Sequence, residues 1–98
     1  MRVGFYRGTI LTPWWLRWVN YLWTGKTVYA DGRVINHILG RQWVTGYHAY
    51  GTSVEWILYP QFSLMDKLWA LDGERSEYLG HLVGTPVWFM LERVEDET

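Results

Sequence analysis

The sequence predicts a single α+β domain, in which a small and mostly antiparallel sheet packs against an N-terminal aromatic helix and one or two helices from the C-terminal half. Three observations carry this prediction. A Thr-Pro pair precedes a long apolar stretch, an Asp-Gly dipeptide separates two β-prone runs, and the tetrapeptide SLMD resembles a helix capping box. The 98 residues are expected to form one domain over residues 1–98, with a solvated acidic tail at about 94–98.

The first two elements are expected to be a short strand and a helix. Residues 2–8 are β-prone and end at a glycine, which predicts a strand. Thr12 is the expected N-cap and Pro13 the first helical residue of a helix over residues 13–23. All but a narrow stripe of this helix is apolar, which indicates that it is buried on several sides or covers a partner.

The tripeptide GKT at residues 25–27 has the letters that end a phosphate-binding loop. That loop begins with a glycine, but Asn20 stands at the corresponding position, inside the expected helix. We therefore interpret Gly25 as the helix stop and residues 26–38 as a hairpin whose turn is the Asp-Gly pair at 31–32.

The middle of the chain is expected to contain a loop and a strand. Glycines punctuate residues 41–51, which read as a loop with room for one short strand. Residues 52–60 predict a strand closed by Pro60, because apolar side chains alternate along it. The alternation sets Val54, Trp56 and Leu58 against Ser53, Glu55 and Ile57.

Two further helices are expected before the end of the chain. The first begins at the SLMD tetrapeptide, residues 63–66, and carries Leu64, Leu68, Trp69 and Leu71. Gly73 interrupts it, and Ser76 is the expected cap of a second short helix that ends at Val83. Residues 87–94 fit a strand or a helix equally well.

The composition narrows the classes of function. Eight Trp, seven Tyr and three Phe are many for 98 residues, so we expect most of them in the core and a few on a contact surface. The absence of cysteine excludes disulfides and thiol nucleophiles. No segment has the length of an apolar membrane span or the pattern of a signal peptide, so a cytoplasmic protein without membrane contact is expected.

The formal charge of −1 conceals an asymmetry between the two halves of the chain. Basic residues dominate residues 1–50 and acidic residues dominate residues 51–98. Either the fold interleaves the two halves or the protein is bipolar and steers a charged partner.

A catalytic site is one alternative that the residues leave open. His37, His48 and His81 lack the spacing of metal ligands, and Ser53 with His48 is a formal Ser-His pair without a nucleophile elbow. A hydrolase-like enzyme would most plausibly use His37 or His48. We expect no enzyme activity, no cofactor and no metal.

A single-stranded nucleic-acid binder is the second alternative. Arginines interleave with aromatic residues in the N-terminal half, and aromatic stacking with basic charge is how single strands are held. Arg17, Arg33 and Arg41 would contact the phosphates. The slight net negative charge and the lack of a recognised nucleic-acid motif make this alternative weaker.

The order of the segments RVGFYRG, the aromatic helix, DGRVINH, GTSVEWILYP and GTPVWF resembles the layout of phage and bacterial NlpC/P60-like proteins, which have a permuted papain fold. The resemblance implies a shortened relative that binds rather than cuts. The family's nucleophilic cysteine has no counterpart, and WTGKTVYADG stands without a histidine where its catalytic histidine strand would lie. Val87 also replaces the tyrosine of the family's GxPY element, so no catalytic residue carries over.

The function expected from the sequence is therefore non-enzymatic binding. We expect a small protein of the phage-encoded inhibitor kind, which occupies a surface of a host protein or complex. Inhibition of a host defence complex, as by an anti-CRISPR protein, is one instance. The candidate partner-binding residues are Trp14, Arg17, Trp18, Tyr21, Trp43, Tyr47, His48 and Tyr50.

Overall fold

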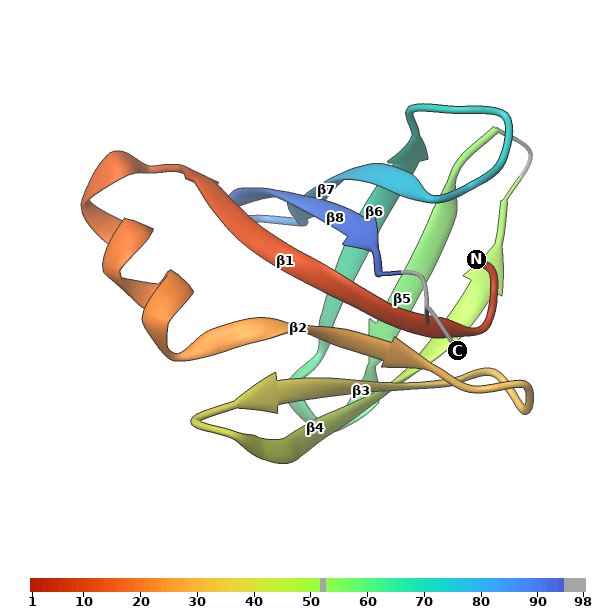
Figure 1. The fold of residues 1–98 in the computed structure, drawn as a ribbon, viewed down its shortest axis with the longest axis horizontal. Coiled ribbons are helices and arrows are strands. Elements are labelled where there is room, and N and C mark those ends of the chain that lie inside the picture. The colour runs from red at the N-terminus through yellow and green to blue at the C-terminus, as the bar shows by residue number, and fades with distance from the viewer. Residues whose placement is uncertain (52, 95–98) are drawn as a thin grey trace.

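The computed structural model describes residues 1–51 and 53–94, except for the side chains of Trp43 and Val44. In this part of the chain, eight antiparallel strands follow one another around a closed barrel (Figure 1). Two short 3₁₀ helices, η1 (Trp14–Tyr21) and η2 (Pro60–Phe62), connect neighbouring strands. The strands are β1 (Gly4–Thr12), β2 (Trp23–Val28), β3 (Arg33–Ile38), β4 (Arg41–Tyr50), β5 (Glu55–Tyr59), β6 (Leu64–Ala70), β7 (Glu77–Leu82) and β8 (Trp88–Arg93).

The first and last strands close the barrel. Each strand pairs with the next in sequence, and β8 returns to pair with β1, where Gly8 stands opposite Leu91. No strand edge among the described residues is therefore left unpaired, which removes the usual site of edge-to-edge association. In Figure 1, η1 lies outside the barrel at one end, between β1 and β2.

The α+β prediction is wrong. Residues 64–70 and 77–82, expected to be helices, form β6 and β7. In β6 the buried residues Asp66 and Leu68 are two apart, which is the period of a strand, but the charge of Asp66 hides that alternation from a reading based on hydrophobicity. The barrel also conflicts with the helix-containing layout of NlpC/P60-like proteins, so that expectation is corrected as well.

The N-terminal helix is shorter than predicted. The opening strand continues past Gly8 to Thr12, η1 occupies only eight residues, and Trp23 already belongs to β2. Pro13 and not Thr12 takes the N-cap position, and its side chain has no group that could cap the helix; the Thr12 hydroxyl donates to the Pro86 carbonyl at 3.1 Å.

The hairpin prediction is confirmed. Strands β2 and β3 pair with Val28 opposite Val34, and the turn between them contains Asp31 and Gly32. Gly32 has a φ of 92°, a conformation that favours glycine, and the Asp31 carboxylate accepts a hydrogen bond from the Arg33 amide at 3.0 Å.

Two expectations for the middle of the chain need correction. The segment read as a loop forms β4, the longest strand. The next strand is confirmed over Glu55–Tyr59, and residues 87–94 also contain a strand, β8. The apolar face assigned to β5 is the wrong one, because its buried side chains are Glu55, Ile57 and Tyr59. The expected acidic tail at residues 95–98 lies outside the described part of the chain.

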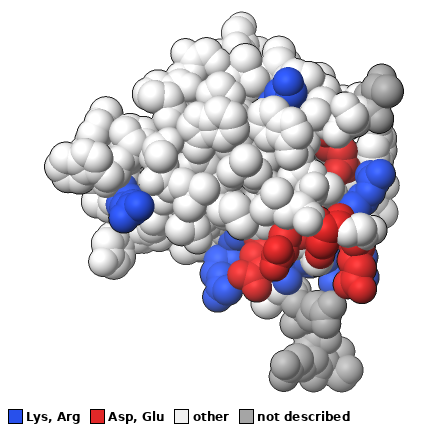
Figure 2. Space-filling model, turned by 90° about the horizontal axis from the view of Figure 1, so that it is seen from above, with Lys and Arg blue, Asp and Glu red and all other residues white. Residues whose placement is uncertain are grey.

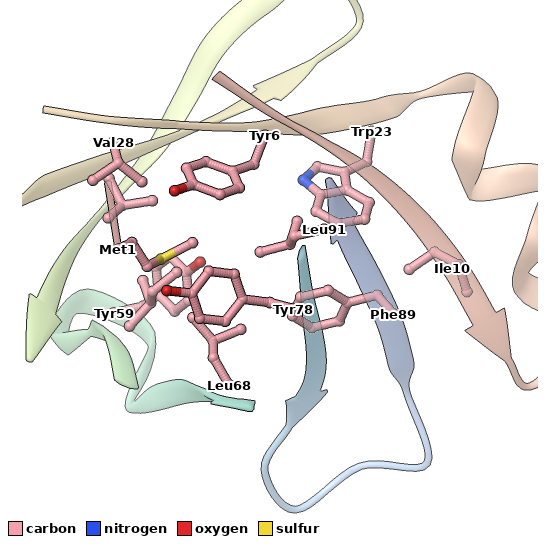
Figure 3. Packing of buried hydrophobic residues seen from close by; sticks show 12 residues of the cluster. Met1, Tyr6, Ile10, Trp23, Val28, Tyr59, Leu68, Tyr78, Phe89 and Leu91 are labelled. Carbon is pink, nitrogen blue, oxygen red and sulfur yellow. The ribbon is translucent and has the colours of Figure 1, made fainter. Parts of the chain in front are cut away.

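The core fills part of the lumen with aromatic and aliphatic side chains from most of the strands (Figure 3). The rings of Tyr6 and Tyr78 meet edge to face with centroids 6.0 Å apart, and those of Trp23 and Phe89 meet at 5.5 Å. The cluster consists of Met1, Tyr6, Ile10, Trp23, Val28, Val34, Ile57, Tyr59, Leu68, Tyr78, Phe89 and Leu91.

Barrel closure brings charges of the two chain halves together. Arg7 of β1 lies 3.1 Å from Glu92 of β8, and Lys26 of β2 lies 3.1 Å from Asp66 of β6. Figure 2 shows positive and negative side chains side by side along one part of the surface, with a wide uncharged area beside them. In these contacts the fold interleaves the two halves.

Two inward-facing glycines make room for the core rings. A Cβ at Gly8 would lie 2.2 Å from the indole of Trp23, and one at Gly80 would lie 2.2 Å from the ring of Phe89. These positions require glycine because the neighbouring ring occupies the space of a side chain.

We predict that Gly80→Ala lowers the free energy of unfolding by about 1–3 kcal/mol, because the added methyl must displace the Phe89 ring from a packed lumen. Urea unfolding measures the change. Gly73→Ala is the matched control, because a Cβ there meets no atom within 4 Å and its φ is not positive. Equal stabilities of the two variants would contradict the packing account.

Candidate functional site

The outer side of η1 exposes an unusual number of large aromatic side chains. Trp14 is 76% exposed, Trp15 57%, Trp18 56% and Tyr21 87%. Arg17, on the same helix, is also exposed. We call these five side chains the aromatic face.

The inner side of η1 anchors the helix to the barrel. Leu16 and Val19 pack against the core cluster. The Asn20 side chain accepts a hydrogen bond from the Ile10 amide of β1 at 2.6 Å. The apolar sequence of η1 is thus divided between a few anchoring residues and an outer face that meets solvent.

The structure divides the predicted partner-binding residues between two elements. Trp14, Arg17, Trp18 and Tyr21 lie together on η1, whereas Tyr47, His48 and Tyr50 lie on β4. Tyr47 and Tyr50 are exposed. His48 is half-buried, and its ring meets that of Tyr50 edge to face at 4.4 Å. Trp43 is also on β4, and its side chain lies outside the described residues.

The half-buried His48 belongs to a polar cluster at the end of the lumen. Its Nε2 lies 2.9 Å from the Glu55 carboxylate, which also pairs with the Met1 amino group and lies 3.6 Å from Arg75. Burial and the nearby Met1 ammonium lower the pKa of His48. Burial opposes ionisation of Glu55, but its hydrogen bonds and the Met1 charge outweigh burial and lower its pKa. Tyr78 faces the same carboxylate. Its pKa is raised, mainly by burial and then by the nearby Glu55 carboxylate.

The three histidines have separate surroundings in the described structure. His37 bonds the Thr27 hydroxyl at 2.6 Å, and His81 bonds the Thr85 carbonyl at 2.8 Å while its ring stacks on Trp88. Ser53 is exposed and is not a hydrogen-bond partner of His48 in the described part of the chain. Among the same residues, no group of three or more His, Cys, Asp or Glu side chains is placed to hold a metal ion.

The arginines proposed for nucleic-acid binding lie on three elements. Arg17 is on η1, Arg33 on β3 and Arg41 on β4, and all three are exposed. Arg33 pairs with Asp31 at 2.8 Å and lies over the Tyr29 ring, so part of its charge is compensated locally.

A second polar cluster, which was not predicted from the sequence, lies inside the barrel. Lys26, Asn36 and Asp66 are 4%, 5% and 3% exposed. The Lys26 ammonium donates to the Asn36 side-chain oxygen at 2.6 Å and to the Tyr59 hydroxyl at 2.5 Å, and it lies 3.1 Å from the Asp66 carboxylate. Tyr59 in turn donates to Asp66 at 2.7 Å. We call these four side chains the lumen quartet.

The pKa values of Lys26 and Tyr59 are both raised inside the barrel. Burial alone would lower the pKa of Lys26, but the Asp66 carboxylate and the Tyr59 hydroxyl outweigh it and raise that pKa. Burial raises the pKa of Tyr59 to about 12. Lys26 is therefore charged and Tyr59 protonated. The ammonium also lies 5.2–5.6 Å from the ring centroids of Trp23, Tyr59 and Phe89, an arrangement that favours a cation.

The lumen quartet borders a cavity of about 270 Å³. The cavity wall is otherwise apolar, and Val19 brings the inner side of η1 into it. Phe62 and Leu64 belong to the wall and are 55% and 39% exposed, so the cavity opens to solvent beside η2. Its lining is Ile10, Val19, Trp23, Lys26, Asn36, Ile38, Tyr59, Phe62, Leu64, Asp66, Leu82, Val87 and Phe89.

One sequence signal could have revealed half of the quartet. The register of the predicted hairpin places Lys26 opposite Asn36, two residues from the apolar pair Val28 and Val34. Residues opposite one another share a face of the sheet, so all four side chains face the lumen. The hydrophobicity pattern of β6, by contrast, did not reveal Asp66.

No protein-family model, curated protein or solved structure matches this chain. The described part of the chain also has no helix with the length and apolar character needed to cross a bilayer.

We predict that Lys26→Met and Asp66→Leu each lower the free energy of unfolding by about 3–5 kcal/mol, because each leaves one buried charge without its partner. The double variant removes both charges and should be about 2–3 kcal/mol more stable than the sum of the single effects implies. Urea unfolding of the four proteins measures this coupling. Additive effects would show that the pair is not coupled in the folded protein.

We also predict that the protein loses stability as the pH falls from 7.5 to 5.5. The pKa of His48 is below its ordinary value of 6.5 in the folded protein, so the unfolded chain takes up this proton more readily and acidification favours unfolding. His48→Gln should lose less stability over the same interval. Urea midpoints at the two pH values measure it, and an equal loss in both proteins would contradict the assignment.

Proposed function

We propose that this protein is a non-enzymatic binding protein that contacts a partner protein through the aromatic face of η1. One observation carries the proposal: three Trp and one Tyr on an eight-residue helix are each more than half exposed. Exposed apolar side chains occur singly on most surfaces, whereas a gathering of this size is typical of an interaction site.

The residue types and their anchoring support a protein partner. Trp, Tyr and Arg are the side chains most enriched among those that dominate the energy of protein interfaces, and all three types are present on η1. Leu16, Val19 and the bond from Ile10 to Asn20 hold the helix in place, so binding does not require the cost of ordering it. The matching surface is an apolar groove with a carboxylate within reach of Arg17.

The identity of the partner stays a prediction: a host protein, for instance a defence complex. The cytoplasm as the place of contact stays a prediction too. The role of the β4 residues Tyr47, His48 and Tyr50 in the same contact also stays a prediction. In the enzyme alternative, the paired His48 and Glu55 would form the site. In the nucleic-acid alternative, Arg17, Arg33 and Arg41 would contact the phosphates.

We predict that Trp14→Ser/Trp18→Ser weakens partner binding by at least about 30-fold, the effect of removing a single dominant interface residue. Wild-type protein is used to capture partners from host lysate, and the best candidate is purified and titrated against each variant. Leu71→Ser is the control, because Leu71 is half exposed but lies in the β6–β7 loop.

The result that supports the proposal is a purified complex that the control retains and the η1 variant loses. A complex equally tight with both variants would overturn it. The proposal would also be overturned if no protein complex forms, and the wild type instead binds single-stranded DNA or lipid vesicles in a way that the η1 variant does not.

A further inference from the structure

We propose that the open end of the barrel is a binding site for a small, uncharged and mostly apolar molecule. This inference is independent of the partner proposed for the aromatic face. It rests on the cavity, on the side chains around it and on the internal bonding of the lumen quartet.

The cavity has the form of a ligand site. An eight-stranded barrel encloses a lumen that is either filled by side chains or left with room for one small ligand. Here Tyr6, Leu68, Tyr78 and Leu91 fill one part completely, each with no exposed surface, whereas about 270 Å³ stay open at the end that carries η1 and η2. Apolar cavities of this kind attract apolar guests, because an empty one forgoes the contacts of its lining.

The volume sets the size of the guest. A cavity of about 150 Å³ accepts benzene, so a cavity of about 270 Å³ that opens to solvent fits a molecule of roughly ten to thirteen non-hydrogen atoms. The rings of Trp23 and Phe89, perpendicular to one another, offer both an edge and a face to an aromatic guest. Small bicyclic aromatics and compact terpenoid-like molecules have this size and polarity.

The lumen quartet selects against charged guests. Lys26 has three N–H groups, and Asn36, Tyr59 and Asp66 supply three acceptors for them within 3.1 Å. An anionic guest would have to displace Asp66 from Lys26, and a cationic guest would have to displace Lys26 from Asp66. Because both charges are buried, either exchange leaves one of them without its partner, which is costly in a lumen of low polarity.

The pairing of Lys26 with Asp66 predicts a change in ligand preference that the shape of the cavity alone would not predict. Asp66→Asn keeps the shape of the side chain and removes its charge, so the Lys26 ammonium becomes available to an anion. The preference of the site should then move from an uncharged guest toward an anionic guest of the same skeleton.

Calorimetric titration with three naphthalene compounds tests the proposal: 2-naphthol, 2-naphthoate and 2-naphthylmethylammonium, which are uncharged, negative and positive at pH 7. We expect 2-naphthol to bind wild type with 1:1 stoichiometry and at least tenfold more tightly than either charged compound. Leu82→Trp fills the cavity and should weaken 2-naphthol binding at least tenfold. Leu71→Trp, the same substitution outside the cavity, should change it less than twofold.

Two further variants separate this site from its alternatives. Trp14→Ser/Trp18→Ser should retain 2-naphthol binding, which distinguishes the lumen from the aromatic face. Asp66→Asn should raise the affinity ratio of 2-naphthoate to 2-naphthol at least tenfold. Thermal unfolding checks that each variant is folded, and if Asp66→Asn does not fold, the ligand series and the Leu82→Trp comparison decide.

The proposal is overturned by no saturable binding of 2-naphthol to the folded wild type, by binding that Leu82→Trp leaves unchanged, or by equal binding of 2-naphthoate and 2-naphthol to wild type. Loss of 2-naphthol binding in the η1 variant would assign the probe to the aromatic face instead and would equally overturn it.

Discussion

The pairing of β8 with β1 is the constraint on which the rest of the structure depends. It turns a row of hairpins into an enclosed lumen, so that every inward side chain faces the same interior. Lys26 and Asp66 are forty residues apart and lie on strands that are not neighbours, yet closure brings them into contact. An open sheet of the same strands would leave both charges on one broad face, where water would separate them.

Local signals in the sequence predicted some elements well. The Asp-Gly turn and the strands on either side of it were found because two residues determine the turn and alternation determines the register. Strand β4 was missed because its glycine was interpreted as a break. Gly46 has a different role: a Cβ there would lie 2.6 Å from the Tyr59 ring, so the glycine makes room for a core side chain inside a regular strand.

The C-terminal helices were predicted wrongly for a related reason. The inward position Asp66 of β6 is polar where a hydrophobicity pattern expects an apolar residue, and Glu55 likewise led to the wrong buried face for β5. The positive charges that pair with them, the Met1 amino group for Glu55 and Lys26 for Asp66, lie far away in the sequence, and no local window contains them. Both polar clusters of the lumen therefore lay beyond pattern reading, apart from the hairpin pair of Lys26 and Asn36.

The core of the barrel contains only some of the aromatic side chains. Within the described residues, five aromatic side chains belong to the core: Tyr6, Trp23, Tyr59, Tyr78 and Phe89. Around these rings the lumen is closely packed, and three strands carry glycine at Gly8, Gly46 and Gly80, where a neighbouring ring occupies the space of a side chain. Of the exposed aromatic side chains in the described part of the chain, four are gathered on the short helix η1.

The unequal filling of the lumen has a consequence for local unfolding. Backbone amides around Tyr6, Tyr78 and Leu68 are held by fully buried contacts, so their hydrogen exchange should require opening of the whole barrel. Those of η1 and of the strand ends beside the cavity are held by fewer contacts and should exchange through smaller openings. The barrel is thus a rigid base that carries a softer rim, and the rim is the end at which both proposed binding surfaces lie.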